Sequence, residues 1–308
     1  MTRQAAHVTP LARALLRWYE RNGRAGLPWR RRRSPYRTLA SEFMLQQTQV
    51  ERVVPSFERF VARFPTIAAL AAASPGEVLR EWRGLGYNGR ALRLHAASCE
   101  IVKKHRGRIP KDGAALLALP GIGRYTAAAI RAFAHDLPDA ALDTNARRVL
   151  HRLRFGIEHP PRATPRDLDA FARGLVPVER SHDWNSAVMD LGASICTARA
   201  PKCAMCPLRR RCAAAPVDAA TLERSRSQHA RRSTRGSVPF EQTDRHARGR
   251  IVDRLRDLPP GQRISLLDLH LDLSGEIRER TTDQVRALVA CLVRDGLVAL
   301  HGDEVCLP

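Results

Sequence analysis

Long hydrophobic runs and cysteines are both scarce in this sequence. No apolar run reaches the roughly 18 residues that a membrane-spanning helix needs. The N-terminal stretch MTRQAAHVTPLARALLRWYERNGR also lacks the apolar core of a signal peptide. The 308-residue chain has seven cysteines, and nothing in their arrangement suggests a disulfide framework. We therefore expect a cytoplasmic protein that has no membrane partner.

Acidic residues are in the minority. The chain has 31 Asp and Glu against 52 Lys and Arg, which gives a formal net charge of +21. A charge of this size predicts a polyanionic partner, and nucleic acid is the usual one. The alternative is a general basic bias, because the chain is also rich in alanine and arginine. We expect association with the nucleoid.

Four of the seven cysteines lie close together with the spacing C-x6-C-x2-C-x5-C. They are Cys196, Cys203, Cys206 and Cys212. Four thiolates over this span are enough to hold one [4Fe–4S] cluster. A zinc site more often uses two C-x2-C pairs, and only one such pair is present. Zinc, two disulfides and four unrelated thiols remain the alternatives at this point.

The alternating pattern of β-strands is rare, so we expect helices over most of the chain. Residues 10–22 form an amphipathic helix with Leu11, Leu15 and Trp18 on one face. Proline and glycine divide 37–135 into short helices, and helical sequence continues over 139–215.

The last third of the chain has a different composition. Residues 216–245 are polar and Arg-rich, which predicts a linker. Residues 246–308 predict a small separate winged-helix-like domain, because helical segments are followed by a hairpin around His301, Gly302 and Asp303. The helical segments are 246–257, 265–273 and 282–294. Such a domain either binds DNA or supports its neighbours, and the sequence leaves both open.

Residues 114–130, AALLALPGIGRYTAAAI, predict two helices joined by a tight turn. Gly121 and Gly123 allow the backbone to turn sharply and to approach a ligand closely. The free N–H groups at the start of the second helix suit a DNA phosphate. Phosphate contacts of this kind position DNA without reading its sequence.

Together these features resemble the helix-hairpin-helix DNA glycosylases, and among them the adenine DNA glycosylases of the MutY type. The resemblance covers about residues 10–215. It rests on LPWR, SEFMLQQTQVERVVPSFERFVARFPT, GLGY, LPGIGRYTAAAI, DTNARRVLHR and WNSAVMDLGASICTARAPKCAMCPL.

The resemblance implies an all-α, two-lobed core with an iron–sulfur cluster loop, followed by the small C-terminal α+β domain. One lobe is a six-helix domain over 30–134 that contains the hairpin. The cluster domain combines 1–29 with 135–215. The implied active cleft lies between these lobes, with Glu42 on one side and Asp143 on the other.

The implied reaction is hydrolysis of the N-glycosidic bond of a flipped adenine that is mispaired with 8-oxoguanine or guanine. Glu42 is the implied general acid at N7, and its apolar neighbours are expected to raise its pKa. Asp143 is the implied anion that stabilises the cationic sugar, and Tyr125 and Asn145 are implied to bond these carboxylates. Tyr125 stands where related lyases have a lysine, so a glycosylase without strong lyase activity is expected. From the residues alone, Glu42 is equally a surface carboxylate and Asp143 equally a helix N-cap.

The resemblance also implies the residues that contact DNA and the cofactor. Gln47 and Tyr87 are the implied wedge residues, Trp29 and Arg30 belong to the adenine pocket, and Ser186 faces the base. Core packing remains the alternative for Trp29 and Tyr87. The hairpin contributes Leu119, Gly121 and Gly123, and the four cysteines hold one [4Fe–4S] cluster per chain. The expected partner is mismatched double-stranded DNA, bound by a monomer.

The sequence departs from the family pattern in three places. Ser186 replaces the usual Glu or Gln, Asn88 follows Tyr87 where a second tyrosine is common, and no Nudix-like C-terminal domain is present. A thymine or uracil glycosylase that acts on G mismatches therefore stays as the alternative. A non-catalytic iron–sulfur DNA-binding protein is a further alternative, which the presence of both Glu42 and Asp143 disfavours.

Overall fold

The computed structural model describes residues 8–159, 161–230, 239–277 and 280–308. These residues are mainly helical, and their strands form one small three-stranded sheet near the C-terminus. They pack into two compact units. The first unit takes the described residues of Met1–Thr38, Pro110–Ala118 and Ile122–Arg235; the second takes Leu39–Ile109, Leu119–Gly121 and Gly236–Pro308. The predicted helical fold with a small C-terminal sheet is confirmed.

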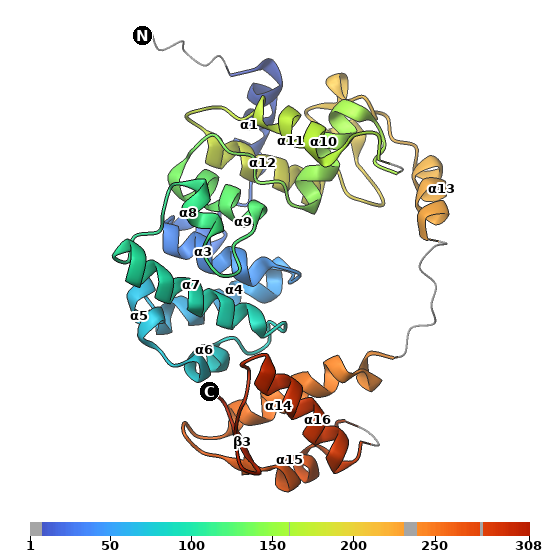
Figure 1. Cartoon of the computed structure of the whole chain (residues 1–308). Helices are drawn as coiled ribbons and strands as arrows, with labels where there is room; N and C mark the ends of the chain where they lie inside the picture. Colours follow the sequence, from blue (N-terminus) through green and yellow to red (C-terminus); the bar gives the residue numbers. More distant parts are fainter. Residues whose placement is uncertain (1–7, 160, 231–238, 278–279) are drawn as a thin grey trace. The chain divides into compact units, whose positions relative to one another are not determined.

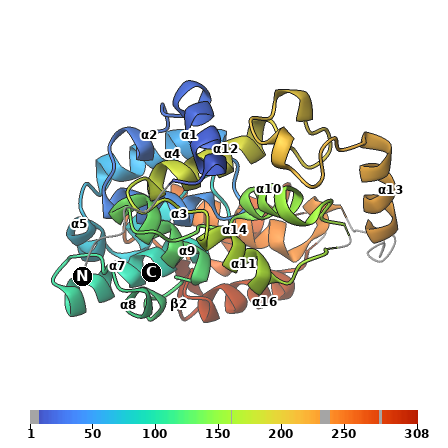
Figure 2. The same ribbon diagram turned by 90° about the horizontal axis from the view of Figure 1, so that it is seen from above.

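The core of the first unit forms where α1 (Pro10–Asn22) and α10 (Thr144–Phe155) pack against α12 (Ser181–Ser194) (Figures 1 and 2). Thr9 caps α1 at the residue before the predicted helix 10–22, because its hydroxyl accepts a hydrogen bond from the N–H of Ala12. Leu15, Val149 and Trp184 are fully buried between these helices. The unit contains α1 (Pro10–Asn22), α2 (Pro28–Arg31), α8 (Gly113–Leu117), α9 (Arg124–Ala129), the π-helix η1 (Ile130–Ala134), α10 (Thr144–Phe155), α11 (Pro165–Arg173), α12 (Ser181–Ser194), the short turns η2 (Cys203–Met205) and η3 (Arg209–Arg211), and α13 (Ala219–Ala230).

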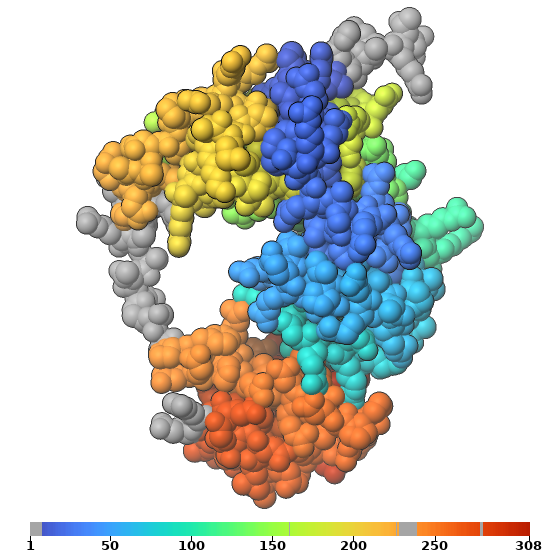
Figure 3. Space-filling view, turned by 180° about the vertical axis from the view of Figure 1, so that it is seen from behind, coloured from blue at the N-terminus to red at the C-terminus, as the bar shows by residue number. Residues whose placement is uncertain are grey.

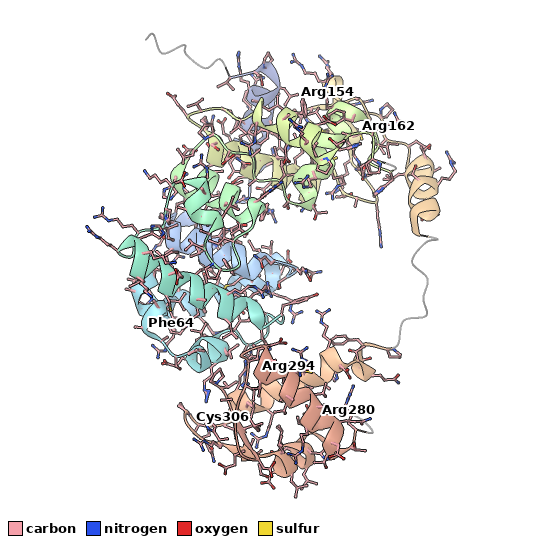
Figure 4. All side chains as sticks on the ribbon, viewed as in Figure 1. Phe64, Arg154, Arg162, Arg280, Arg294 and Cys306 are labelled. Carbon is pink, nitrogen blue, oxygen red and sulfur yellow. The ribbon has the colours of Figure 1, made fainter. Side chains whose placement is uncertain are left out.

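The N-terminal part of the second unit is a group of helices around an aromatic core. Phe60 contacts Phe64 and Trp82 edge to face, with ring centroids 5.0 and 5.9 Å away, and all three rings are buried (Figure 4 labels Phe64). The helices are α3 (Pro35–Leu45), whose first turn lies in the other unit, α4 (Val50–Arg63), α5 (Ile67–Ala72), α6 (Pro75–Glu81) and α7 (Gly89–His105).

The C-terminal residues have the predicted order of helices followed by a hairpin. The antiparallel sheet has the order β1-β3-β2, with Val305 paired to both Ile264 and Leu300. The elements are η4 (Phe240–Gln242), α14 (Asp244–Asp257), β1 (Ile264–Ser265), α15 (Leu266–Leu273), α16 (Thr282–Arg294), β2 (Ala299–His301) and β3 (Glu304–Cys306).

These C-terminal residues pack directly on α6 within the second unit. In Figure 3 their orange and red atoms lie against the cyan atoms of the helical part. The N–H of Gly76 donates to the Pro308 carbonyl over 2.6 Å, and Arg80 donates to the Leu258 carbonyl over 2.9 Å. The C-terminal sequence is therefore attached to the helical part through its backbone as well as through side chains.

The two compact units divide the chain differently from the predicted domains, since 236–308 groups with 39–109. This division does not test whether 30–134 or 246–308 folds alone, so those boundaries stay predictions. The predicted linker 216–245 contains α13 and the start of α14, and its residues 231–238 lie outside the described residues. Among the described helices, none is both long and apolar enough to span a bilayer.

Candidate active site

Asp143 lies directly before α10 and caps its first turn. Its Oδ1 accepts a hydrogen bond from the N–H of Ala146 over 2.6 Å, and its Oδ2 accepts one from the side-chain amide of Asn145 over 3.3 Å. Burial raises the pKa of Asp143, while these bonds and the charge of Arg148 act in the opposite direction. Asp143 is therefore the N-cap of α10, and the same hydrogen bonds hold its carboxylate in a fixed position.

Arg148 connects this carboxylate region to the cysteine loop. Its Nη2 donates to the Asn145 side-chain oxygen over 2.7 Å and to the Gly192 carbonyl over 2.8 Å. Its Nε donates to the Cys196 carbonyl over 2.8 Å. Gly192 is needed for this packing, because a Cβ at this position would lie 2.8 Å from the Cβ of Asn145. The position of Asn145 thus depends on α12 and on the start of the cysteine loop.

Glu42 lies in the last part of α3, within the second unit. Its side chain is buried, with 6% exposure, and the adjacent Phe43 and Met44 are fully buried. The structure therefore gives Glu42 the desolvated environment that its predicted role as a general acid needs, and a surface carboxylate is excluded.

The predicted turn between two helices is present between α8 and α9. Gly121 has a φ of +74°, and a Cβ on it would lie 2.9 Å from both the Phe43 ring and the Arg93 side chain. Glycine is therefore required there by conformation and by space. Gly123 precedes α9 and has nothing within 4 Å of its own Cβ position, whereas Leu119 is buried. The open side of the turn is at Gly123.

Tyr125 is half-buried on α9 and lines an open pocket of about 520 Å³ in the first unit. Leu142, which directly precedes Asp143, lines the same pocket. The remaining charged lining is mixed, since Arg124 and Arg147 face it together with Asp139. Tyr125 therefore lines the same pocket as the residue that directly precedes Asp143.

Gln47 and Tyr87 lie on two exposed loops of the second unit, and both have left-handed backbones. Their φ angles are 57° and 47°, which is uncommon for residues other than glycine. Gly84 and Gly86, just before Tyr87, are also left-handed. Tyr87 is 42% exposed, so simple core packing does not explain its ring.

Arg90, at the start of α7, ties these two loops together. Its Nη1 donates to the carbonyls of Phe43 and Met44 over 2.9 and 2.8 Å, and also to the Gln46 carbonyl. Its Nη2 donates to the carbonyls of Leu85 and Gly86 over 3.0 and 3.1 Å. Only 3% of Arg90 is exposed, and burial lowers its pKa to about 10. One buried guanidinium therefore fixes the backbone on which both predicted wedge residues are placed.

Arg30 has a partner that the sequence did not predict. Its guanidinium forms a bidentate pair with Asp190 on α12, with N–O distances of 2.7 and 3.1 Å, and Arg24 bonds the same carboxylate. Asp190 is buried, yet these arginines hold its pKa below the ordinary value. Arg30 thus holds the N-terminal segment on α12, and Trp29 beside it is half-buried. Their contact with adenine stays a prediction.

Ser186 is completely buried on α12, and its hydroxyl has no hydrogen-bond partner among the described residues. A fully buried side chain cannot touch a flipped base without a rearrangement. The neighbouring Asn185 is bonded on both sides, accepting from the N–H of Ala141 over 2.7 Å and donating to the Asp139 carbonyl over 2.9 Å. Contact of Ser186 with the base stays a prediction.

The four cysteines line one pocket of the first unit, next to Arg152 and Arg209. Burial raises the pKa of the thiols of Cys196 and Cys212, and it raises that of Cys206 to about 11. No three or more His, Cys or acidic side chains of the described chain are arranged to hold a metal ion. A single tetrahedral ion needs its sulfurs around one point, whereas a four-iron cluster is held by four separate cysteines. The four thiols thus line one pocket, as a set of cluster ligands requires.

Arg152 on α10 fixes the cysteine loop from the side of the core. It is 1% exposed and forms a bidentate pair with Glu158, with distances of 2.6 and 2.7 Å. It also donates to the Thr197 carbonyl over 2.7 Å, and its own carbonyl accepts from the Cys212 thiol over 3.3 Å. Both ends of the loop therefore contact a single residue of α10.

The residues that sequence reasoning missed are mostly arginines with structural contacts, namely Arg90, Arg148 and Arg152, together with their acidic counterpart Asp190. The chain has 52 Lys and Arg, and the helical pattern alone does not separate the few buried ones from the many exposed ones. The one available signal was position. Arg90 lies three positions after Tyr87, and Arg148 and Arg152 lie four positions apart on the helix that follows Asp143.

Comparison with known proteins defines the class. Residues 40–173 match the family model of the HhH-GPD superfamily of base excision DNA repair proteins. Among solved structures, the chain is similar to a thermostable thymine-DNA glycosylase, with a TM-score of 0.60 and 29% identity over 65% of this chain and 93% of that one. A non-covalent endonuclease III–DNA complex shows the same fold, with a TM-score of 0.56 and 23% identity over 65% of this chain and 91% of that one.

Curated relatives give a narrower assignment. The chain is 42% identical to the adenine DNA glycosylase of Mycolicibacterium smegmatis, over 94% of this chain and 95% of that protein. It is 40% identical to the adenine DNA glycosylase of Mycobacterium tuberculosis, over 94% of this chain and 93% of that protein. The human adenine DNA glycosylase matches 69% of this chain at 39% identity, and 40% of its own length is covered. The chain belongs to the adenine DNA glycosylase family.

Proposed function

We propose that this protein is a monofunctional DNA glycosylase of base excision repair that removes adenine mispaired with 8-oxoguanine or guanine. The observation that carries this proposal is the 42% identity to an adenine DNA glycosylase along almost the whole chain. The match includes residues beyond the glycosylase core, so the C-terminal part is shared with relatives of the same name. The named relatives do not favour the thymine and uracil alternative.

Glu42 is the proposed general acid. Adenine leaves its sugar poorly as an anion, so a proton must reach the ring as the N-glycosidic bond breaks. The 6% exposure of Glu42 keeps this carboxyl largely out of bulk water, as a general acid in an active site requires. The carboxyl gives its proton to N7, and the bonding electrons go to the base.

Asp143 is the proposed anion that faces the electron-deficient sugar. Loss of the base leaves an oxocarbenium-like C1′, which a fixed carboxylate stabilises, as in glycoside hydrolysis. The bonds from Ala146 and Asn145 favour the charged form against the effect of burial. Water then adds to C1′ and loses a proton to the Glu42 carboxylate, which restores the acid, and the product is an abasic site.

Tyr125 supports the absence of a lyase step. A phenol cannot form a Schiff base with the sugar, so the phosphodiester next to the abasic site stays intact. We propose that Tyr125 orients the reacting groups from the pocket that it lines with Leu142.

The four cysteines are the proposed ligands of one [4Fe–4S] cluster. When bound, the cluster would supply a rigid attachment for the loop 196–212 and no step in base removal. Arg152 and Arg148 lie beside Cys196 and would offset the negative charge of the ligands. Iron and sulfide content of the purified protein, with Cys206→Ser as the comparison, tests this assignment.

Double-stranded DNA is the proposed partner, bound by a monomer in the cytoplasm at the nucleoid. The net charge of +21 supports a DNA ligand, and the endonuclease III structure with the same fold was solved with DNA. The open side of the turn at Gly123 is the proposed phosphate contact.

Adenine release from a duplex with adenine opposite 8-oxoguanine tests the proposal. Under single-turnover conditions we expect release by the wild type, with strand breakage only after alkali treatment. Glu42→Gln should slow release by about 10²-fold or more, because the amide cannot donate the proton. Glu51→Gln removes an exposed carboxylate from the first turn of α4 and should leave the rate unchanged. Unchanged release by the Glu42 variant would contradict the assigned mechanism.

A further inference from the structure

Two exposed aromatic rings of the second unit are joined by one arginine. Tyr87 and Phe240 are 42% and 53% exposed, in a chain with only 5% aromatic residues. The guanidinium of Arg245 lies over both rings, 4.1 Å from the Tyr87 centroid and 5.8 Å from that of Phe240. We call these three residues the Tyr87–Phe240 stack. Exposed aromatic groups gathered in this way indicate a binding surface rather than a core.

The stack combines the Tyr87 loop with the C-terminal residues. Tyr87 belongs to the helical part of the unit, whereas Phe240 and Arg245 come from η4 and the first turn of α14. Arg245 is exposed, so its stacked position does not result from burial. The contact is a cation–π interaction, which holds a planar guanidinium parallel or close to an aromatic face.

A second arginine of α14 is hydrogen-bonded to the loop that contains Tyr87. Arg256 is 7% exposed, and its Nη2 donates to the Asn88 side-chain oxygen over 2.8 Å. Its Nε donates to the Leu79 carbonyl over 2.7 Å, and Asp253 balances its charge. Asn88, the position where a second tyrosine is common in the family, is therefore the attachment point of α14 in this chain.

The start of α14 is fixed as well. The Thr243 hydroxyl accepts from the N–H of His246 over 3.2 Å, and Arg280 pairs with Asp244 over 2.8 Å (Figure 4 labels Arg280). A capped and paired first turn limits the positions that Arg245 can take. The loop and the helix end that form the stack are thus both held by their surroundings.

From this arrangement we propose that the Tyr87–Phe240 stack is a base-stacking surface for DNA and that the C-terminal residues complete it. The ligand is an unstacked base on the strand that faces the Tyr87 loop. Aromatic faces and a guanidinium bind unstacked bases without reading their identity, and the cation suits a polyanion. The inference rests on the proposed function, which brings DNA to Tyr87. It adds that residues of α14 increase the affinity for distorted duplexes.

Binding to a duplex that has no base to release tests this without any catalytic step. The probe is a fluorescent duplex with a tetrahydrofuran abasic-site analogue opposite 8-oxoguanine or guanine, compared with a fully paired duplex. Arg245→Ala should weaken binding to both abasic duplexes about five- to tenfold and change the paired duplex less than twofold. Phe240→Ala should have the same pattern, and Arg245→Lys should restore part of the loss.

Matched controls lie on the same C-terminal elements. Arg254→Ala removes an arginine that pairs with Asp272 instead of Tyr87, and Leu271→Ala removes an exposed apolar side chain of α15. Neither should change binding to any duplex. Equal weakening of abasic and paired duplexes by Arg245→Ala, with a salt slope lower by about one unit, would identify a simple phosphate contact and overturn the proposal. Unchanged binding by both Arg245→Ala and Phe240→Ala would also overturn it.

This experiment separates the inference from the proposed function. Failure of the wild type to release adenine would reject the proposed function and leave the binding comparison valid. The wild type could release adenine normally while Arg245→Ala and Phe240→Ala distinguish abasic from paired duplexes as well as the wild type does. That result would reject only the proposed base-stacking surface.

Discussion

The two units each contain a buried arginine that fixes a loop, and the two arginines are balanced differently. Arg152 is paired with a carboxylate, because Glu158 binds it through both oxygens at 2.6 and 2.7 Å. Arg90 donates instead to backbone carbonyls and to the Thr48 hydroxyl, and its pKa falls to about 10 with burial. The cysteine loop thus rests on a neutral ion pair. The Gln47 and Tyr87 loops rest on a guanidinium that faces the Trp82 and Tyr87 rings and pairs with no carboxylate of the described residues.

This difference matches what the two loops are proposed to do. The cysteine loop is a permanent attachment, and a neutral pair gives it a fixed structure at the cost of two desolvated charges. The Gln47 and Tyr87 loops are proposed to meet DNA, whose phosphates would add negative charge near Arg90. Their left-handed residues are also held in place before DNA arrives.

Removal of Arg152 is expected to have the largest effect on stability. Arg152→Met leaves Glu158 without its partner and should lower the free energy of unfolding by about 3–5 kcal/mol. Urea titration measures this, with Arg154→Met as the control on the exposed face of α10 (labelled in Figure 4). Adding Glu158→Gln to Arg152→Met should recover part of the loss. A double variant no more stable than the single one would contradict the ion-pair explanation.

Removal of Arg90 should lower the free energy of unfolding by less than removal of Arg152, because the Arg90 variant also loses a buried charge that has no ion-pair partner among the described residues. Arg90→Met leaves several loop carbonyls without a donor, and we expect a loss of about 2–3 kcal/mol. Lys103→Met, at an exposed position of the same helix, is the control. The comparison predicts that mismatched DNA stabilises the wild type more than the Arg90 variant in thermal melts. Equal stabilisation by DNA would show that Arg90 does not prepare the loops.

Removal of the Asp143 charge should have the smallest effect on stability, and it should raise stability instead of lowering it. Because burial raises its pKa, the folded state binds its proton more tightly than the unfolded state, whose pKa is about 3.8. The contribution of this carboxyl to stability therefore falls as the pH rises from 3.8 through the folded pKa. Asparagine keeps the cap without the charge. Asp143→Asn should raise Tm at pH 7, lose this advantage near pH 4, and slow adenine release by about 10²-fold.

Asp112→Asn is the matched control, since Asp112 caps α8 from an exposed position by accepting from the N–H of Ala115. It should change neither Tm nor the rate of release. A lower Tm for Asp143→Asn at pH 7 would contradict the buried-charge argument, whatever its effect on the rate.

Much of this site was predictable from the sequence. The Asp143 cap, the glycine turn at Gly121 and the helix 10–22 follow from local residue preferences, which tertiary packing here reinforces. The environment of Glu42 also followed from its apolar neighbours in the sequence. These are features that a few adjacent residues determine.

The remainder depends on contacts between distant residues. The pairing of Arg30 with Asp190 joins residues 160 positions apart, and Arg256 reaches Asn88 across 168 positions. The complete burial of Ser186 was likewise not predicted from the sequence. Helical periodicity places a residue on a face of its helix, but it does not say which face another helix covers.

The central claim is that this protein removes adenine, rather than thymine or uracil, from mismatched duplexes. The most direct measurement is the single-turnover rate of base release from four duplexes, with adenine opposite 8-oxoguanine, adenine opposite guanine, thymine opposite guanine and uracil opposite guanine. We predict the fastest release for adenine opposite 8-oxoguanine and negligible release of thymine and uracil. Release of thymine or uracil faster than adenine would contradict the claim.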